Sequence, residues 1–219
     1  MKIKFSWKAL VLIVTSVFIL VGCASSPEKQ LAKQRAAALE ALKPIQTIPE
    51  KRPNWVDSLP ITNKELAFVG VSNQYATESE ARNAAQGDGR NQLIKYYGTF
   101  ISDKGRTASA TYGITSDVFD PQVASQELEE YVAEGLAKAM PAKEFYTEIY
   151  VTTSAKYAYK AYALMVINKA DADKALKEYC EQKAAEYQSK AEAEKDAEKR
   201  KQFEKTAEIF GGSLQSSMF

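Results

Sequence analysis

The stretch KEFYTEIYVTTSAKYAYKAYALMVI, residues 143–167, decides the fold, because it holds two alternating apolar runs around a short polar break. Both runs, 143–152 and 156–167, have the period of two that is typical of half-buried strands. A three-residue turn at 153–155 pairs apolar with apolar side chains, whereas a turn of two or four residues opposes apolar to polar faces. The stretch therefore predicts an antiparallel hairpin, although its turn lacks the glycine that such turns usually contain. The predicted pairs are Val151 with Tyr157, Ile149 with Tyr159 and Glu148 with Lys160.

The second of these strands is expected to be central in its sheet, since residues 161–167 are apolar on both faces. The residues predicted to face inward are Phe145, Thr147, Ile149, Val151, Tyr157, Tyr159, Ala161, Ala163, Met165 and Ile167. Tyr146 and Tyr150 share the other face with Lys160. These three residues are a candidate interaction surface, or else they lie beneath a helix or the polar segment near residue 105.

Upstream of the hairpin, the apolar run 66–72 predicts another strand, and a helix follows it. Thr77 and Glu80 form a capping box that opens a helix running to about Tyr97, with Gly98 just beyond its end. Residues at a spacing of four form its packing face, and a small residue at Gly89 allows close approach to the sheet. The Ser/Thr-rich residues 99–114 are expected to form either a long polar strand or a short strand and a loop. The packing face of the helix that begins after Thr77 consists of Ala81, Ala85, Gly89, Leu93 and Tyr97.

The remaining elements are helical. Asp120 and Pro121 start a helix that Pro141 ends. Residues 171–210 are expected to form a C-terminal helix, charged and projecting after about residue 190, with 211–219 a disordered tail. Phe203 and Phe210 then belong to a frayed end or contact another subunit.

These elements predict an α+β fold: a single small domain, residues 53–170, whose sheet of about four strands packs against helices in the order β-α-β-α-β-β-α. The long charged C-terminal helix follows it. Cys180 is expected to be a small buried hydrophobe on this helix, and an intermolecular disulfide is the alternative.

The N-terminus has the pattern of a lipoprotein precursor. Residues 1–22 combine three lysines with an apolar run that is too short for an ordinary membrane span, and they are expected to be a signal peptide. Leu20-Val21-Gly22-Cys23 resembles the bacterial lipobox. The resemblance implies that Cys23 is lipidated and that the chain is cut before Cys23, which becomes the first mature residue. Residues 23–52 are then lipid anchor and tether. Within them, 28–43 (EKQLAKQRAAALEALK) is rich in helix formers, and its thin apolar stripe favours a spacer over a helix docked on a neighbour.

Composition excludes several functions. Without the three lysines of residues 1–22, the chain carries 26 basic against 28 acidic residues, so no nucleic-acid partner is expected. The sequence has no histidine, which removes Ser-His-Asp and Cys-His catalysis and most zinc sites. Gly87–Arg90 lies within a helical pattern, so it does not predict a phosphate loop. Glu127, Glu129 and Glu130 are read as a solvated face rather than metal ligands, and no catalytic, cofactor or metal site and no small-molecule substrate are predicted.

The segments of residues 53–170 resemble the LPP-twenty lipoprotein family, to which the flagellum-associated FlgP proteins are related. The resemblance implies a compact, often oligomeric domain on a lipid anchor, without enzymatic activity.

The expected function is a structural or assembly role in the bacterial envelope, at the outer membrane, in a ring or scaffold near the flagellar motor. In a Gram-positive host the anchor implies the outer face of the plasma membrane. The alternative is a monomeric binding module or surface antigen that contacts cell wall, a wall synthase or an external surface. The residues that carry the resemblance are Pro53-Asn54-Trp55-Val56, Pro60, Phe68–Ser72, Glu80-Ala81-Arg82, Ala84-Ala85, Arg90–Leu93 and Tyr157–Ile167.

Overall fold

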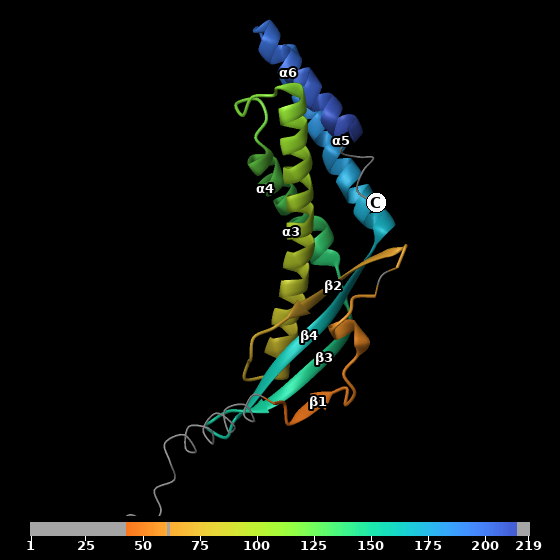
Figure 1. Cartoon of the computed structure of the whole chain (residues 1–219), viewed down its shortest axis with the longest axis vertical. Coiled ribbons are helices and arrows are strands. Elements are labelled where there is room, and N and C mark those ends of the chain that lie inside the picture. The colour runs from red at the N-terminus through yellow and green to blue at the C-terminus, as the bar shows by residue number, and fades with distance from the viewer. Residues whose placement is uncertain (1–42, 61, 214–219) are drawn as a thin grey trace, which may run out of the picture. The chain divides into compact units, whose positions relative to one another are not determined.

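A single antiparallel sheet organises the part of the chain that the computed structural model describes, residues 43–60 and 62–213 (Figure 1). Its strands are β1 (Gln46–Ile48), β2 (Glu65–Val71), β3 (Ala142–Val151) and β4 (Tyr157–Asn168), in the order β1-β3-β4-β2. The α+β class, the sheet of four strands and the central place of β4 confirm the sequence prediction. The predicted signal peptide, Cys23 and most of the predicted tether lie outside the described residues.

The β3–β4 hairpin has the predicted register. Val151 lies opposite Tyr157, Ile149 opposite Tyr159 and Glu148 opposite Lys160. The Thr152 amide donates to the Lys156 carbonyl at 2.8 Å, which closes a loop of three residues. Ala155 takes the left-handed conformation, φ 57°, at the position where such loops favour glycine.

Helix α3 (Glu78–Tyr112) covers the inner face of the sheet with its first half. It begins as predicted, since Thr77 accepts a hydrogen bond from the Glu80 amide and donates to the Glu80 carboxylate. Gly70 of β2 lies against the backbone of Ala85 and Gly89, so neither glycine has room for a side chain. This close approach brings the helix directly onto the sheet.

The predicted end of this helix at Gly98 is wrong, and so is the strand predicted within residues 99–114. The helix continues to Tyr112 and ends at Gly113, whose φ of 64° is left-handed. The hydroxyl of Thr107 donates to a carbonyl four residues earlier, as does that of Thr111, so polar side chains that suggested a strand are satisfied within a helix. The packing face simply continues at the same spacing, and Gly98 lies against Glu129 of the next helix.

The remaining strand comes from the predicted tether instead. β1 pairs with β3 at residues 147–149, so the folded part begins before residue 53. The sequence does not predict it, because β1 has only three residues, too few for a visible alternating pattern.

Helix α4 (Pro121–Val132) starts as predicted, with Asp120 accepting from the Gln122 amide, and continues as a π-helical turn, η2 (Ala133–Ala137). It packs along the second half of α3. The serine side chain of Ser125 donates to the Gly98 carbonyl in that interface.

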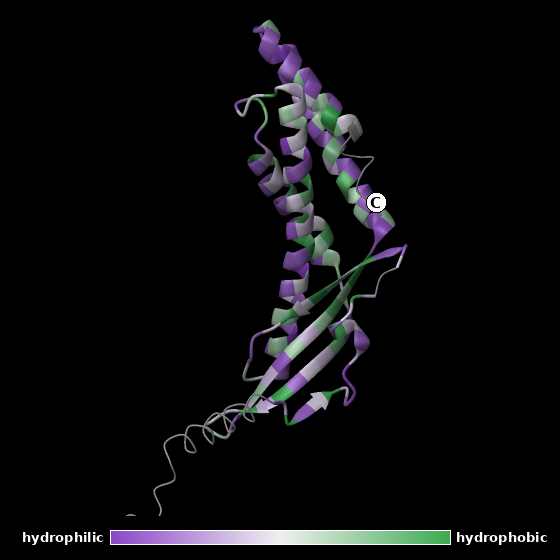
Figure 2. Cartoon of the chain, viewed as in Figure 1, coloured by the Kyte–Doolittle hydropathy of each residue, from purple (hydrophilic) through white to green (hydrophobic). Residues whose placement is uncertain are grey.

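The C-terminal region is a pair of helices, α5 (Lys169–Ala193) and α6 (Ala197–Glu208), followed by η3 (Ile209–Ser213). The predicted projecting helix is therefore wrong beyond residue 193, and the predicted tail begins within η3. Asp196 caps a new helix, and α6 folds back along α5 (Figures 1 and 2). Phe203 of α6 and Phe210 of η3 are buried with Phe119, Tyr179 and Tyr187. This packing holds α6 against α5, so the charged residues after 190 do not form one continuous projecting helix.

Candidate functional site

The outer face of the sheet, opposite α3, carries the polar cluster that best qualifies as a site. Tyr146 of β3 lies beside Tyr162 and Leu164 of β4 on this face, and residues 52–60 cross over them. Pro53 precedes η1 (Asn54–Val56), a single turn that places Trp55 on the sheet with 7% of its surface exposed. A second, small apolar core therefore lies on this side.

Arg52 ties this covering segment to the sheet. Its guanidinium donates to both carboxylate oxygens of Asp57, at 3.0 and 2.9 Å, and to Glu148 Oε1 at 2.7 Å. It also lies over the rings of Tyr146 and Tyr162, at 5.3 and 5.2 Å from their centroids. The hydrogen bond from Arg52 lowers the pKa of Asp57 and, in return, the pKa of Arg52 is raised above its usual value. These contacts hold the guanidinium charged and in place.

Glu148 is the buried acid of this cluster, with 6% of its surface exposed. Besides Arg52, it accepts hydrogen bonds from the hydroxyls of Tyr150 at 2.7 Å and Tyr162 at 3.3 Å. Burial, and then the hydrogen bond to Glu148, raise the pKa of Tyr150. Both carboxylate oxygens thus have partners, the guanidinium on Oε1 and two phenol hydroxyls on Oε2, which suits a structural tie rather than acid–base chemistry.

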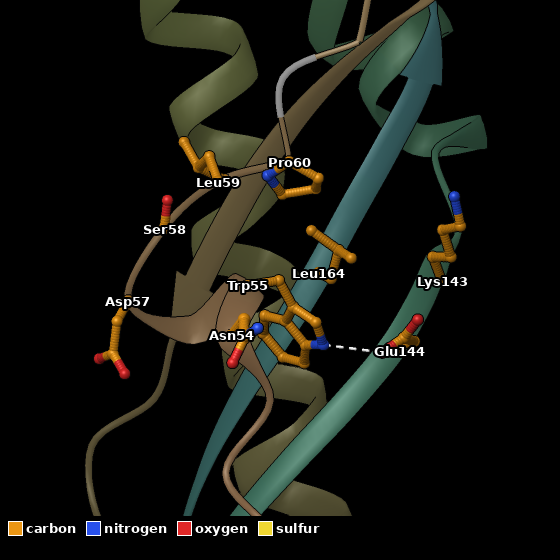
Figure 3. Close-up of a pocket in the computed structure, with 9 residues that line it drawn as sticks. All are labelled: Asn54, Trp55, Asp57, Ser58, Leu59, Pro60, Lys143, Glu144 and Leu164. Carbon is orange, nitrogen blue, oxygen red and sulfur yellow. Dashed lines mark hydrogen bonds between the residues drawn. The ribbon is translucent and has the colours of Figure 1, made fainter.

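An open pocket of about 780 Å³ lies beside this cluster, between the Trp55 segment and the start of β3 (Figure 3). The indole nitrogen of Trp55 donates to Glu144 at 2.7 Å, and Leu164 lies on the sheet beneath it. The pocket has an apolar floor at Leu164 and charged residues of both signs, Asp57, Lys143 and Glu144, around it. This mixture suits binding of an amphipathic group. The lining residues are Asn54, Trp55, Asp57, Ser58, Leu59, Pro60, Lys143, Glu144 and Leu164.

The structure places the predicted interaction residues away from open surface. Tyr146 is 3% exposed and packs with Trp55, whereas Tyr150 is 8% exposed and donates its hydroxyl to Glu148. Lys160 is half-buried, with its ammonium 5.2 Å from the Tyr162 ring centroid. A surface made of these tyrosines is therefore a wrong prediction. The alternative that the segment near residue 105 covers them is wrong as well, because that segment belongs to α3 on the opposite side of the sheet.

Phe203 and Phe210 are likewise corrections to the predicted surface. Phe210 is fully buried and stacks on Tyr187 at 5.6 Å, and Phe203 lies 6.3 Å from the same ring. Their role in the described chain is to join α6 and η3 to α5. Cys180, by contrast, is buried as predicted, and burial raises its pKa to about 12.

Arg52 and Trp55 are not among the predicted site residues, because residue 52 falls in the predicted tether. The available signal was a tryptophan between Pro53 and Pro60, a pattern that suits a segment lying on apolar surface. Glu127, which was predicted to lie on a solvated face, pairs with Lys183 at 2.8 Å. Asp88, within Gly87–Arg90, accepts a hydrogen bond from the Val71 amide at 2.9 Å.

Comparisons with family models, with curated proteins and with solved structures found no match to this chain. Within residues 43–60 and 62–213, no group of three or more Asp, Glu, His or Cys side chains is placed to hold a metal ion. The same part of the chain holds no helix with the length and apolarity to cross a bilayer.

Proposed function

We propose that this protein is a lipid-anchored, non-catalytic component of the bacterial envelope with a structural or assembly role. The support for the anchor is the sequence Leu20–Cys23 behind a basic and then apolar leader. Two or more acyl chains give a stable anchor, at about 0.8 kcal/mol for each buried CH₂. We further propose the outer membrane as its site, in line with the resemblance to the LPP-twenty family.

The observation that supports the structural role is that the chain enters the fold near the start of α3, whereas α6 packs at the end of α3. The chain enters the fold beside the hairpin, where the Ile45 amide donates to the Ile149 carbonyl at 2.8 Å. The α5–α6 pair meets the other end of α3, where Lys205 lies over the ring of Tyr112 and Lys199 pairs with Asp117. A helix of 35 residues is about 50 Å long. An anchor on the first end therefore presents the helical pair at a fixed distance from that end.

The outer-face cluster also suits a scaffold rather than an enzyme. Its charges are partnered within the fold: Arg52 with Asp57 and Glu148, and Glu148 with two tyrosine hydroxyls. The lack of histidine in the whole sequence removes the commonest general base. The proposed partners are the membrane, through lipid on Cys23, and other copies of the chain or an envelope protein.

A monomeric binding module is the second candidate, and the pocket beside Trp55 favours it. An indole edge, Pro60 and Leu59 around an apolar floor are the kind of surface that docks a peptide or an amphipathic envelope component. Multi-angle light scattering of the detergent-solubilised mature protein separates the candidates. A stable oligomer across a tenfold dilution supports assembly, and a monomer supports the module.

The anchor itself is tested by Cys23→Ser in the producing cell. We expect wild-type protein to incorporate labelled palmitate and to sediment with membranes, and the variant to lose both properties. Equal labelling of the two proteins would contradict the proposal. Ala24→Ser is the matched control, because it changes a neighbouring residue without removing the thiol that accepts lipid.

A further inference from the structure

One carboxylate in the pocket beside Trp55 has no cation as a partner. Three charged side chains line this pocket: Asp57, Lys143 and Glu144 (Figure 3). Asp57 pairs with Arg52 at 2.9 Å, and Lys143 pairs with Glu65 at 3.5 Å. Glu144, in contrast, forms no ion pair within residues 43–60 and 62–213. Because the other two charges are paired within the fold, the pocket presents one uncompensated negative charge.

The fold holds Glu144 in position but leaves half of its carboxylate open to a ligand. The indole nitrogen of Trp55 donates to Oε2 of Glu144 at 2.7 Å, whereas Oε1 accepts from no described residue. Trp55 itself is fixed on the sheet, since only 7% of its surface is exposed. A neutral donor therefore orients the carboxylate, and its second oxygen is available for a charge-assisted hydrogen bond with a cationic group.

The rest of the pocket combines an apolar floor with polar side chains on one wall. Leu164 forms the floor, and Leu59, which is 46% exposed, lies on the wall with Pro60. Asn54 and Ser58 belong to the same wall, and neither side chain hydrogen-bonds to another described residue. An amide and a hydroxyl suit the N–H and C=O groups of an extended peptide, whereas a hydrocarbon tail makes no use of them.

We propose that this pocket binds an extended peptide segment of another protein through a basic side chain of that segment. The apolar stem of the side chain lies on Leu164, and its charged head pairs with Glu144, because lysine and arginine combine these two properties in one side chain. A volume of about 780 Å³ also takes the residues beside it. The inference rests on the second candidate function, the binding module, and names the partner that its pocket recognises.

A titration of the mature chain in detergent micelles with three matched peptides tests this proposal. The peptides are acetyl-Leu-Lys-Ala-amide and its counterparts with Gln or Glu in place of Lys. The NMR signal of the Trp55 indole N–H reports binding, because Trp55 is the one tryptophan after residue 22 and its N–H contacts Glu144. We expect the Lys peptide to bind with a Kd roughly fivefold lower than that of the Gln peptide, and the Glu peptide to bind more weakly still.

Three variants separate the charge of the pocket from its apolar surface. Glu144→Gln keeps an oxygen acceptor for the indole but removes the charge, so the Lys and Gln peptides are expected to bind it equally. Leu59→Ser removes part of the apolar wall and is expected to weaken both peptides to the same extent, which leaves their ratio unchanged. Glu192→Gln removes an exposed charge from α5 and is the matched control, with both Kd values as in wild type.

Equal binding of the Lys and Gln peptides to wild type overturns the proposal, and so does a Lys preference that persists in Glu144→Gln. An indole signal that no peptide shifts also overturns it. If that signal moves instead in nanodiscs that contain phosphatidylethanolamine, the ligand is a lipid amine. The light-scattering test remains separate: a monomer without a Lys preference removes this inference alone, whereas an oligomer with that preference removes the monomeric module and keeps the site.

Discussion

Arg52 joins the segment that precedes η1 to the buried end of β3, across 96 residues of sequence. Its side chain is 39% exposed, whereas that of Glu148 is 8% exposed, so the two partners differ in what their loss leaves behind. Removing the arginine leaves an acid buried with only two phenol donors. Removing the acid leaves a guanidinium that still pairs with Asp57 and still has access to water.

Arg52→Met is therefore expected to lower the free energy of unfolding by about 2 kcal/mol, since a buried carboxylate loses its cation. Asp57→Asn, which leaves the Glu148 contact in place, is expected to cost much less. Urea unfolding followed by Trp55 fluorescence measures both. Equal losses for the two variants would show that the tie is to the exposed aspartate rather than to the buried glutamate.

A comparison of two buried tyrosines isolates the value of one hydrogen bond. The Tyr97 hydroxyl is buried without a hydrogen-bond partner among the described residues, whereas the Tyr179 hydroxyl donates to the Ala124 carbonyl at 3.2 Å. Tyr97→Phe is expected to leave the free energy of unfolding unchanged or raise it. Tyr179→Phe is expected to lower it by about 1 kcal/mol. Denaturant titrations check the pair, and a loss for Tyr97→Phe as large as that for Tyr179→Phe would contradict the assignment.

At the scale of elements, the interface between β2 and α3 depends on two glycines that touch. A Cβ on Gly70 meets the carbonyl of Ala85 and the amide of Gly89, both backbone atoms that no rotamer change removes. Gly70→Ala is expected to cost about 3 kcal/mol by forcing the helix from the sheet. Gly87→Ala, at a helical position with open space around it, is expected to stabilise by up to about 1 kcal/mol. Thermal unfolding checks both, and two changes of the same sign would count against the close packing.

How much of the fold was predictable depends on whether a local pattern encoded it. The β3–β4 hairpin followed from register alone, and the start of α3 followed from Thr77 and Glu80. The end of α3 could not be predicted in this way, because Ser and Thr within residues 99–112 weaken the helical pattern. The packing of Gly98 against Glu129, within the continuous helix, is a tertiary contact that no local pattern shows.

The candidate site was less predictable than the fold. Nothing local to Arg52 indicates that Glu148 is its partner, since their pairing requires β1 to place the chain beside β3. The burial of Tyr146 follows from the same crossing segment, through Trp55. The return of α6 along α5 was hidden because Asp196, which caps the new helix, reads equally well as one more charge within a continuous helix.

At the scale of the whole molecule, the fold responds to pH through buried neutral groups. Burial raises the pKa of the Cys180 thiol to about 12 from its usual 9.0, and that of the Tyr187 hydroxyl to about 12 from its usual 10.0. The unfolded chain therefore loses these protons before the folded chain does. Stability is fully present below about pH 9 and falls as pH rises toward 12.

The expected result is a free energy of unfolding that declines steadily between pH 9 and pH 11, measured by urea titration with circular dichroism. Cys180→Ala is expected to flatten part of this decline, because it removes one of the groups whose pKa is raised by burial. Lys190→Gln, an exposed change near Tyr187, serves as the control and leaves the slope in place. A slope unaffected by Cys180→Ala would place the thiol in contact with water.

The central claim is that a packed, non-catalytic domain is fixed to a membrane through Cys23, and the intact mass of the protein isolated from its own membranes tests it most directly. We expect a chain that begins at Cys23 and carries the added mass of a diacylglycerol, with or without a further acyl chain. An unmodified chain that retains residues 1–22, or one cut at another position, would contradict it.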